Sequence, residues 1–283
     1  SGGRYSYYNR KNRFFADLRD GDAVRNAVMS CKPDVIINLA AQTAVSFSFI
    51  NPIDVQQTNF IATASLAEAA RDSGVKHFIH ASTSEVYGKS DKFPITEDTP
   101  LTATSPYAVA KIAAENYLWL MHEISGFPVT VVRPFNTYGR AGIGVQNRHY
   151  VVERAICQAL EDHEIHLHSS DPKRDFLFRQ DHCMGYIRVI QAGDKVVGEA
   201  VNLSTGLCWT IEEMAQQVAK SVGELEELCI GRKVKVCFDN KPDRPKDIDT
   251  LHGSSEKMFK LTGWRPEYTF ESGIKQAVKE WKE

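Results

Sequence analysis

The sequence predicts an α/β fold built on a doubly wound parallel sheet, with a smaller α+β lobe toward the C-terminus. Between residue 22 and about residue 135, apolar runs of strand length alternate with helical stretches. The runs are continuously apolar, which is typical of parallel strands that helices cover on both faces. After residue 136 this alternation weakens. We therefore expect the sheet domain over residues 1–140 with parts of 175–205, and the lobe mainly over 141–283.

The elements of the sheet domain follow in chain order. A short helix, a strand, an Ala-rich helix, a strand, a long helix and a strand are expected over 22–30, 33–41, 54–74, 75–82, 105–126 and 128–136. Gly74 lies in the C-cap region of the Ala-rich helix. Ser105 is a good N-cap for the long helix, with Pro106 in its first turn, and Gly126 ends it. Strands separated by helices in this way imply βαβ crossovers.

The elements of the lobe are less regular. Helices are expected over 149–162 and 210–223, and a short strand followed by a helix within 171–193. Thr210 and Glu213 have the spacing of a capping box, which predicts the start of the second helix. The stretch 254–283 predicts two short helices around a Gly-Trp-Arg-Pro turn. The glycines of 139–144 follow the wrong strand for a cofactor turn, and we expect them in a loop on the substrate side.

Composition excludes several classes of partner. The net charge of −2 gives no reason to expect a nucleic acid or a membrane surface as a partner. No apolar run approaches the roughly 20 residues that span a bilayer, and no stretch resembles a signal peptide. The six cysteines include no Cys-x-x-Cys pair, which favours reduced thiols in a cytoplasmic protein. His163, His166 and His168 could bind a metal, but a strand with alternating exposed histidines is the better interpretation, and no metal is expected.

Polar side chains follow three of the predicted strands where each strand ends. They lie at 38–42, 82–85 and 133–136. In an open parallel sheet the carboxyl ends of the strands meet at one edge, and ligands bind there. The long helix that starts at Ser105 begins beside this edge. The sequence therefore predicts one site built from these three ends and the first turns of that helix.

Tyr107 and Lys111 lie on one face of the long helix, because they are four residues apart. A phenol is a poor base at neutral pH, but a nearby ammonium favours the phenolate and lowers its pKa. The hydroxyl of Thr83 could share the proton, so the group could deprotonate a sugar or alcohol hydroxyl during hydride transfer. Tyr-x-x-x-Lys alone usually marks a solvated helix face. The preceding strand end "STSE" makes a chance occurrence less plausible.

In this order the motifs resemble those of the extended short-chain dehydrogenase/reductase family that acts on nucleotide sugars. They are "LAAQ" at 39–42, "STSEVYG" at 82–88, "SPYAVAK" at 105–111, "RPFNTYG" at 133–139, "KRDFLFRQD" at 173–181 and "GWRP" at 263–266. The resemblance covers nearly the whole chain. It implies a Rossmann-type domain that binds NAD and a lobe that binds the sugar nucleotide.

The resemblance also implies roles for particular residues. It makes Tyr107, Lys111 and Thr83 catalytic, together with Ser84 and Glu85. The implied cofactor residues are Asp17, Leu18, Ala40, Ala41, Gln42, Tyr107, Lys111, Pro134 and Phe135. The implied substrate residues are Asn136, Arg174 and Arg244. An Arg fork suits a diphosphate; the alternative for the two arginines is a surface ion pair with Asp175 or Asp243.

The family's Gly-x-x-Gly-x-x-Gly turn, which cradles the cofactor pyrophosphate at a helix N-terminus, does not occur in the sequence. The chain opens at a point that corresponds to the approach to the family's third strand. We therefore expect a sheet that is truncated at its N-terminal side, either in a fragment or in a natural variant. We also expect weak or no NAD binding by this chain alone.

Glu85 favours a nucleotide-sugar 4,6-dehydratase, because such enzymes need a base that removes the C5 proton once C4 is a ketone. Within the family, the stretches 94–111 and 133–139 look closest to the branch acting on N-acetylhexosamine nucleotides. The alternatives are a nucleotide-sugar 4-epimerase, a UDP-glucuronate decarboxylase, and a cofactor-deficient relic that only binds sugar nucleotides or acts as a scaffold.

The family further implies a homodimer through the helices at 54–73 and 105–125.

Overall fold

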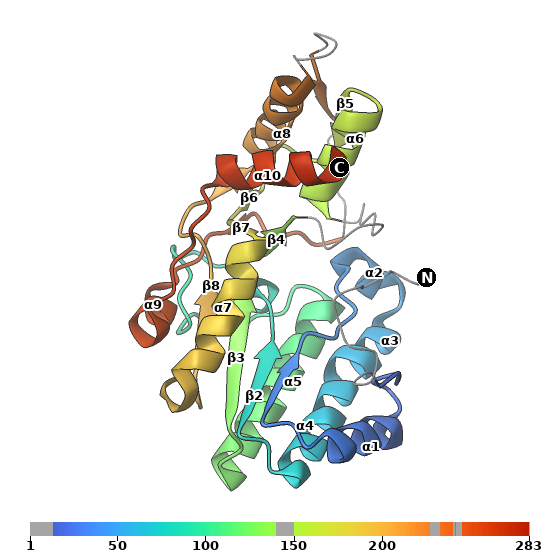
Figure 1. Ribbon diagram of the computed structural model, residues 1–283. Helices are drawn as coiled ribbons and strands as arrows, with labels where there is room; N and C mark the ends of the chain where they lie inside the picture. The colour runs from blue at the N-terminus through green and yellow to red at the C-terminus, as the bar shows by residue number, and fades with distance from the viewer. Residues whose placement is uncertain (1–13, 140–149, 227–232, 240, 242–244, 283) are drawn as a thin grey trace.

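The computed structural model describes residues 14–139, 150–226, 233–239, 241 and 245–282. Its centre is a parallel sheet with strand order β1–β2–β3–β8 (Figure 1). The four strands are Val35–Asn38, His77–Ala81, Val129–Pro134 and Ala200–Leu203. Their register pairs Ile37 with Ile79 and Val132 with Val201. The parallel sheet confirms the predicted fold class.

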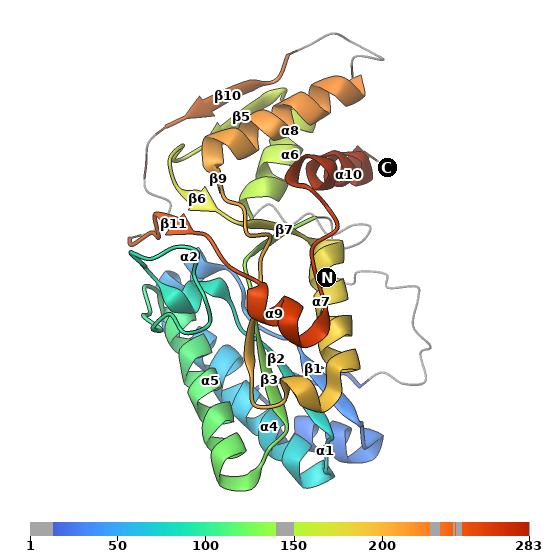
Figure 2. The ribbon, with the colours of Figure 1, turned by 90° about the vertical axis from the view of Figure 1, so that its left-hand side faces the viewer.

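Helices cover both faces of this sheet (Figures 1 and 2). On one face α4 (Ala62–Ser73) and α5 (Pro106–Ser125) pack over a core that includes Phe78 and Leu118. On the other face α7 (Arg179–Ala192) and α9 (Glu256–Thr262) pack over a core that includes Ile79 and Val201. The remaining helical elements on the sheet side are α1 (Gly21–Cys31), α2 (Val45–Ile50), α3 (Pro52–Gln56), η2 (Gln57–Ile61), η3 (Ser84–Tyr87) and η4 (Gly193–Val196).

A second core lies above the carboxyl edge of the sheet (Figure 1). It is formed by α6 (Val151–Glu161), α8 (Ile211–Glu226), α10 (Phe270–Lys282) and β5 (Glu164–Leu167), with β7 (Phe176–Phe178). The short strands β4 (Asn136–Tyr138), β6 (Lys173–Arg174), β9 (Trp209–Thr210), β10 (Lys235–Phe238) and β11 (Thr250–Leu251) complete the described elements. β4 pairs with β7 directly after β3 ends, so the chain enters this second core at the edge of the sheet.

The local signals in the sequence predicted several element ends correctly. Ser105 Oγ accepts a hydrogen bond from the Ala108 amide at 3.1 Å. Gly126 ends α5 with a φ of 65°, in the left-handed region that favours glycine. The Thr210 amide donates to Glu213 Oε2 at 2.8 Å, and the Glu213 amide donates to Thr210 Oγ1 at 3.0 Å. The capping box is therefore confirmed.

Several details differ from the expectation. The single helix predicted over 54–74 contains a π-helical turn at 57–61. Helix α2 and strand β8 carried too short a signal to be assigned, since each spans only a few residues.

Strand β5 confirms the strand expected around the histidines, with Ile165 buried and His166 exposed. Strand β8 and helix α7 belong to the sheet side, but the boundary near residue 140 stays a prediction.

Within the described residues, no helix has the length and apolar character needed to cross a bilayer. The same part of the chain holds no group of three or more His, Cys, Asp or Glu side chains that could bind a metal ion. Its cysteines, which are Cys31, Cys157, Cys183, Cys208 and Cys237, carry free thiols.

Candidate active site

The loop that follows β2 carries the predicted catalytic residues Thr83, Ser84 and Glu85 at the carboxyl edge of the sheet. We refer to residues 82–85 as the lip. Thr83 is the N-cap of η3, and its Oγ1 accepts a hydrogen bond from the Glu85 amide at 3.2 Å. This cap turns the chain back over the edge, so that Ser84 and Glu85 are buried rather than extended into solvent. The lip is thus a short, capped turn with a buried carboxyl group.

Tyr107 lies in the first turn of α5 and is buried, with 6% of its surface exposed. Its hydroxyl and Thr83 form a side-chain hydrogen bond, so the structure brings these two predicted residues together. Burial raises the pKa of Tyr107 above its usual value, and the bond to Thr83 opposes this shift. The charge of Glu85 adds to the increase, which places that carboxyl near the phenol as well.

Lys111 is buried one turn further along α5, and its Nζ donates to the Ala81 carbonyl oxygen at 2.7 Å. Burial lowers the pKa of Lys111 to about 8, while the charge of Glu115 acts in the opposite direction. We expected the lysine charge to lower the pKa of Tyr107. The structure differs, because burial outweighs every favourable contact of the phenol and Thr83 supplies the opposing hydrogen bond.

A buried ion pair that the sequence did not reveal lies beneath the lip. Arg133 at the end of β3 donates to Glu115 of α5, with Nη2 to Oε2 at 2.6 Å and Nε to Oε1 at 3.1 Å. The hydroxyl of Ser82 also donates to Glu115, and Arg133 Nη1 donates to the Tyr87 hydroxyl at 3.0 Å. Buried charges require such partners. Glu115 lies four residues beyond Lys111, and this spacing was the available signal.

The turn after β1 is fixed by two buried amides. Asn38 Oδ1 accepts from the Ala40 amide at 3.3 Å, which shapes the backbone that carries Ala40 and Ala41. Asn59, in the π-helical turn η2, clamps Gln42: the Gln42 amide donates to Asn59 Oδ1 at 2.8 Å, and Asn59 Nδ2 donates to the Gln42 carbonyl at 2.9 Å. Such π turns are frequent at functional sites, and here one positions a predicted cofactor residue.

The other predicted cofactor residues differ in accessibility. Asp17 is exposed and paired with Arg19 at 2.6 Å, and hydrogen bonds from Arg19 lower its pKa to about 2. Leu18 beside it is half-buried. Pro134 is half-buried at the end of β3. The Phe135 ring is buried and stacked on Tyr87, and its amide donates to the Leu203 carbonyl at 2.9 Å.

The predicted substrate residues are only partly described. Asn136 Oδ1 is buried and has no hydrogen-bond partner, as is typical of a polar atom that a ligand completes. Arg174 is buried and pairs with Asp247 at 2.9 Å. The alternative partner Asp175 is therefore wrong, since its carboxylate accepts from the amides of Thr205 and Gly206. Arg244 and Asp243 lie outside the described residues.

Helix α7 contributes polar groups that the sequence analysis missed. His182 Nδ1 lies 2.9 Å from Thr137 Oγ1. His182 Nε2 and the Tyr186 hydroxyl are both buried and lack a hydrogen-bond partner. The pKa of Tyr186 is raised by burial and also by the charge of Tyr107, which places the two phenols near each other. The i, i+4 spacing of His182 and Tyr186 was the signal that could have found them.

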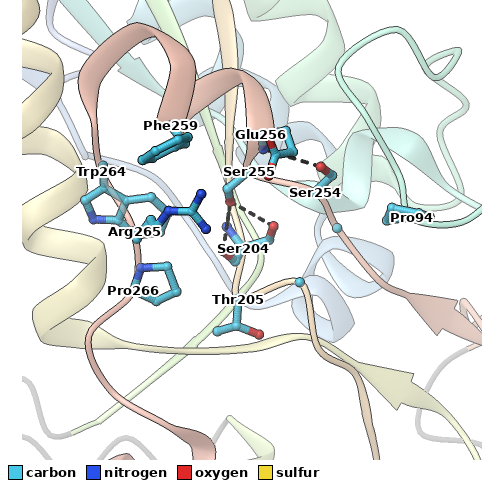
Figure 3. Close-up of a pocket in the computed structure, with 12 residues that line it drawn as sticks. Pro94, Ser204, Thr205, Ser254, Ser255, Glu256, Phe259, Trp264, Arg265 and Pro266 are labelled. Atoms are coloured by element: carbon cyan, nitrogen blue, oxygen red, sulfur yellow. Dashed lines mark hydrogen bonds between the residues drawn. The ribbon is translucent and has the colours of Figure 1, made fainter.

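A separate cavity lies between the end of β8 and helix α9 (Figure 3). Ser255 Oγ accepts from the Ser204 amide at 2.7 Å and donates to the Ser204 carbonyl at 2.8 Å. The Arg265 guanidinium stacks over Phe259 at 3.8 Å from the ring centroid. None of the predicted catalytic residues lines this cavity, so it is distinct from the lip at 82–85.

Comparison with known proteins identifies the family of the chain. Residues 5–277 match the family model described as GDP-mannose 4,6 dehydratase. The chain is 30% identical to the dTDP-D-glucose 4,6-dehydratase of Mus musculus over 276 residues, which is 96% of this chain and 75% of the relative. It is also 30% identical to a dTDP-glucose 4,6-dehydratase of Xanthomonas campestris, over 93% of this chain and 76% of the relative.

Solved structures share the fold along nearly the whole chain. The UDP-glucose 4-epimerase of Thermotoga maritima, solved with UDP-glucose, superposes with a TM-score of 0.87 at 26% identity, covering 100% of this chain and 88% of the other. A dTDP-glucose 4,6-dehydratase of Streptomyces venezuelae, solved with NAD, gives 0.81 at 25% identity, covering 94% and 78%. Dehydratases and epimerases therefore both share this fold.

Proposed function

The chain belongs to the GDP-mannose 4,6 dehydratase family, and we propose that it catalyses the 4,6-dehydration of a nucleotide sugar. The reaction oxidises C4, eliminates water across C5 and C6, and reduces C6 to give a 4-keto-6-deoxy sugar nucleotide. The observation that carries this proposal is the buried carboxyl of Glu85 beside the hydrogen-bonded pair of Tyr107 and Thr83. An epimerase needs the pair but has no use for the carboxyl.

NAD is the cofactor that we propose. The reactive end of a dinucleotide fits the edge that Lys111, Tyr107 and the backbone at Ala40 form, because a buried ammonium suits a ribose hydroxyl and the small alanine side chain leaves the edge open. NAD, when bound, supplies the acceptor and later the donor of a hydride. The weak affinity expected without a glycine-rich turn stays a prediction.

The proton from the C4 hydroxyl goes to Tyr107. Its phenolate must form in a buried position, so the chain has to offset the burial that raises the pKa. Thr83 does so through its hydrogen bond. The cation of Lys111 is largely present at neutral pH, because its pKa is about 8, and we assign it to the cofactor ribose. The bond from Lys111 to Ala81 fixes that cation at the end of β2.

We assign the elimination of water to Glu85. Once C4 is a ketone the C5 proton is acidic, and the carboxylate removes it. Ser84 has no acidic proton to give, so we also assign to Glu85 the return of that proton to the departing C6 hydroxyl. One proton thus moves from C5 to Glu85 and leaves in the water. When the hydride returns to C6, C5 takes up one proton, and the proton released earlier from the C4 hydroxyl balances this uptake. The buried position of Glu85 keeps the proton from exchanging freely with solvent.

Product analysis tests the proposal. The full chain is incubated with millimolar NAD, because weak NAD binding is expected, together with dTDP-glucose, GDP-mannose or UDP-N-acetylglucosamine. The product is followed by the alkaline absorbance of a 4-keto sugar. We expect one of these substrates to give that product. Glu85→Gln should abolish it, whereas Glu164→Gln, which changes an exposed carboxyl of β5, should not. A 4-epimer or a pentose as product would contradict the proposal. The substrate that gives product also tests whether the chain belongs to the branch that acts on N-acetylhexosamine nucleotides.

We further propose a homodimer through the helices on the α5 side of the sheet. Val109, Leu120 and Ile124 of α5 are exposed, and they lie within about 60° of one another around the helix axis. Ile53 and Ile61, on the neighbouring α3–η2 segment, are exposed as well. Apolar side chains gathered in this way are typical of a covered surface, which supports the dimer but leaves it a proposal.

A cytoplasmic location is likewise proposed from the free thiols.

A further inference from the structure

The cavity between β8 and α9 is walled by two segments that lie far apart in the sequence (Figure 3). One wall is the loop at 204–206, directly after β8, and the other is the stretch at 253–256, which leads into α9. The Ser255 hydroxyl donates to the Ser204 carbonyl and accepts from the Ser204 amide. The walls also approach closely at Gly253, where a Cβ atom would lie 2.7 Å from Ser204 Cβ. The cavity therefore has fixed walls.

Two opposite charges line this cavity, and the described part of the chain neutralises neither of them. Arg265 carries the positive charge, and its guanidinium stacks over the Phe259 ring at 3.8 Å from the centroid. Glu256, in the first turn of α9, carries the negative charge. Neither side chain forms an ion pair with the other or with another described residue. Both charges are therefore available to a ligand.

Stacking on Phe259 orients the guanidinium of Arg265. The guanidinium is a planar fork of N–H donors whose geometry matches a carboxylate bidentately. Because the ring covers one face of the plane, the donors at its edge remain free for an anion. Trp264 and Pro266 flank Arg265 and line the same cavity. A ligand bound here meets a cation, a carboxylate and an apolar wall.

We propose that this cavity is a binding site for a small zwitterion, an α-amino acid. The carboxylate of the ligand pairs with Arg265 and its ammonium group pairs with Glu256, so one molecule compensates both charges. A simple anion suits Arg265 but is repelled by Glu256, and a simple amine has the reverse difficulty. The volume of about 160 Å³ lies below the roughly 300–1,000 Å³ of sites for drug-sized ligands, which favours a small molecule. Binding at this cavity does not depend on the dehydration proposed above.

The cavity walls continue into residues that are expected to hold the substrate. The amides of Thr205 and Gly206 donate to the Asp175 carboxylate at 2.8 Å and 3.0 Å. The Asp175 carbonyl accepts from the Asn136 amide at 3.0 Å, and Arg174 directly precedes Asp175. Strand β11, which leads into the other wall, pairs with β6 and so with Arg174. An amino acid in the cavity should therefore change the affinity for the nucleotide, as an effector does.

The indole N–H resonance of Trp264 reports on the cavity directly. The chain has four tryptophans, so a nitrogen–proton correlation spectrum shows four indole peaks, and Trp264→Phe identifies the one from this site. Titration of the full chain with L-serine, without NAD or nucleotide, should shift this peak with a dissociation constant in the millimolar range or tighter. Calorimetry measures the same constant without the assignment. Acetate and ethylamine each carry one of the two charges and should bind at least about tenfold more weakly, because one charge-assisted contact is not made.

Charge variants test the two contacts separately. Arg265→Gln and Glu256→Gln should each weaken L-serine binding at least about tenfold. Both side chains are exposed, so the fold should tolerate these changes. The matched controls are Lys260→Gln and Glu267→Gln, which neutralise exposed charges that do not line the cavity. The controls should leave the dissociation constant unchanged.

Coupling is measured with UDP, dTDP and GDP, using the one that binds most tightly. Saturating L-serine should change its dissociation constant at least about threefold in the wild type and not in Arg265→Gln. Absence of binding at about 10 mM L-serine, acetate binding as tightly as L-serine, or unchanged binding in both charge variants would overturn the amino-acid site. Binding of L-serine with an unchanged nucleotide affinity would reject the coupling. None of these measurements uses NAD or turnover, so their failure is separate from a failure of the proposed dehydration.

Discussion

Glu153 should make the stability of the protein depend on pH near neutrality. This carboxyl lies in the first turn of α6 and is 5% exposed. One oxygen accepts from the Gly139 amide at 2.8 Å, and the other is buried with no partner. Burial raises its pKa from 4.5 to about 7, since the charged form is poorly solvated there.

The size and sign of the effect follow from linkage. A pKa that is raised by about 2.5 units corresponds to about 3 kcal/mol, at 1.36 kcal/mol per unit, as an upper bound. Between pH 4.5 and 7 the folded protein holds a proton at Glu153 that the unfolded chain has lost. The contribution to stability is therefore fully present below pH 4.5 and is lost as the pH rises to about 7.

The assay compares urea unfolding of the wild type with Glu153→Gln from pH 4.5 to pH 8. The glutamine keeps an oxygen for the Gly139 amide but does not titrate. Relative to the wild type, the free energy of unfolding of the variant should increase by up to about 3 kcal/mol as the pH rises to 7, and it should not increase further above pH 7. Glu164→Gln is the control, because hydrogen bonding to His166 lowers the pKa of this exposed carboxyl below its usual value. Glu164 is therefore ionised in the folded and the unfolded state over most of this range, and its variant should show little pH-dependent difference from the wild type. A difference between Glu153→Gln and wild type that does not change over this range would refute the reasoning.

Four further predictions concern the site and its surroundings. Tyr107→Phe should reduce turnover at least about 100-fold, because it removes the proposed base, while sugar-nucleotide binding, measured by calorimetry, changes little. Glu115→Gln should lower the free energy of unfolding in urea by about 3–5 kcal/mol, because it leaves the buried charge of Arg133 without its partner. The control Asp34→Asn, which breaks an exposed ion pair, should change this free energy little. Equal effects of the two variants would contradict this reasoning. A calorimetric titration of residues 1–283 with NAD should show no dissociation constant in the micromolar range, because these residues contain no glycine-rich turn, and micromolar affinity would contradict this expectation. Ile124→Glu should convert the proposed dimer to a monomer in light scattering, and a wild type that is already monomeric would reject the dimer.

Periodicity and caps predicted most of the sheet domain, because they report on local chain energetics. The continuous apolar runs placed β1, β2 and β3, and Ser105 and Gly126 set the ends of α5. The capping box at Thr210 fixed the start of α8 for the same reason. Strand β8 was not assigned, because Glu199 and Asn202 interrupt its apolar run, and pairing with β3 completes it.

Within the site, the sequence by itself determined which residue types meet at the carboxyl edge, since parallel strands end together and Tyr107 and Lys111 share a helix face. The tertiary structure alone decided their surroundings. Burial, which outweighs the hydrogen bond from Thr83, sets the pKa of Tyr107, and contacts across long stretches of sequence pair Arg133 with Glu115. The tertiary fold also brings Tyr186 of α7 near Tyr107 of α5. Desolvation and pairing depend on neighbours in space, so local sequence patterns could not reveal them.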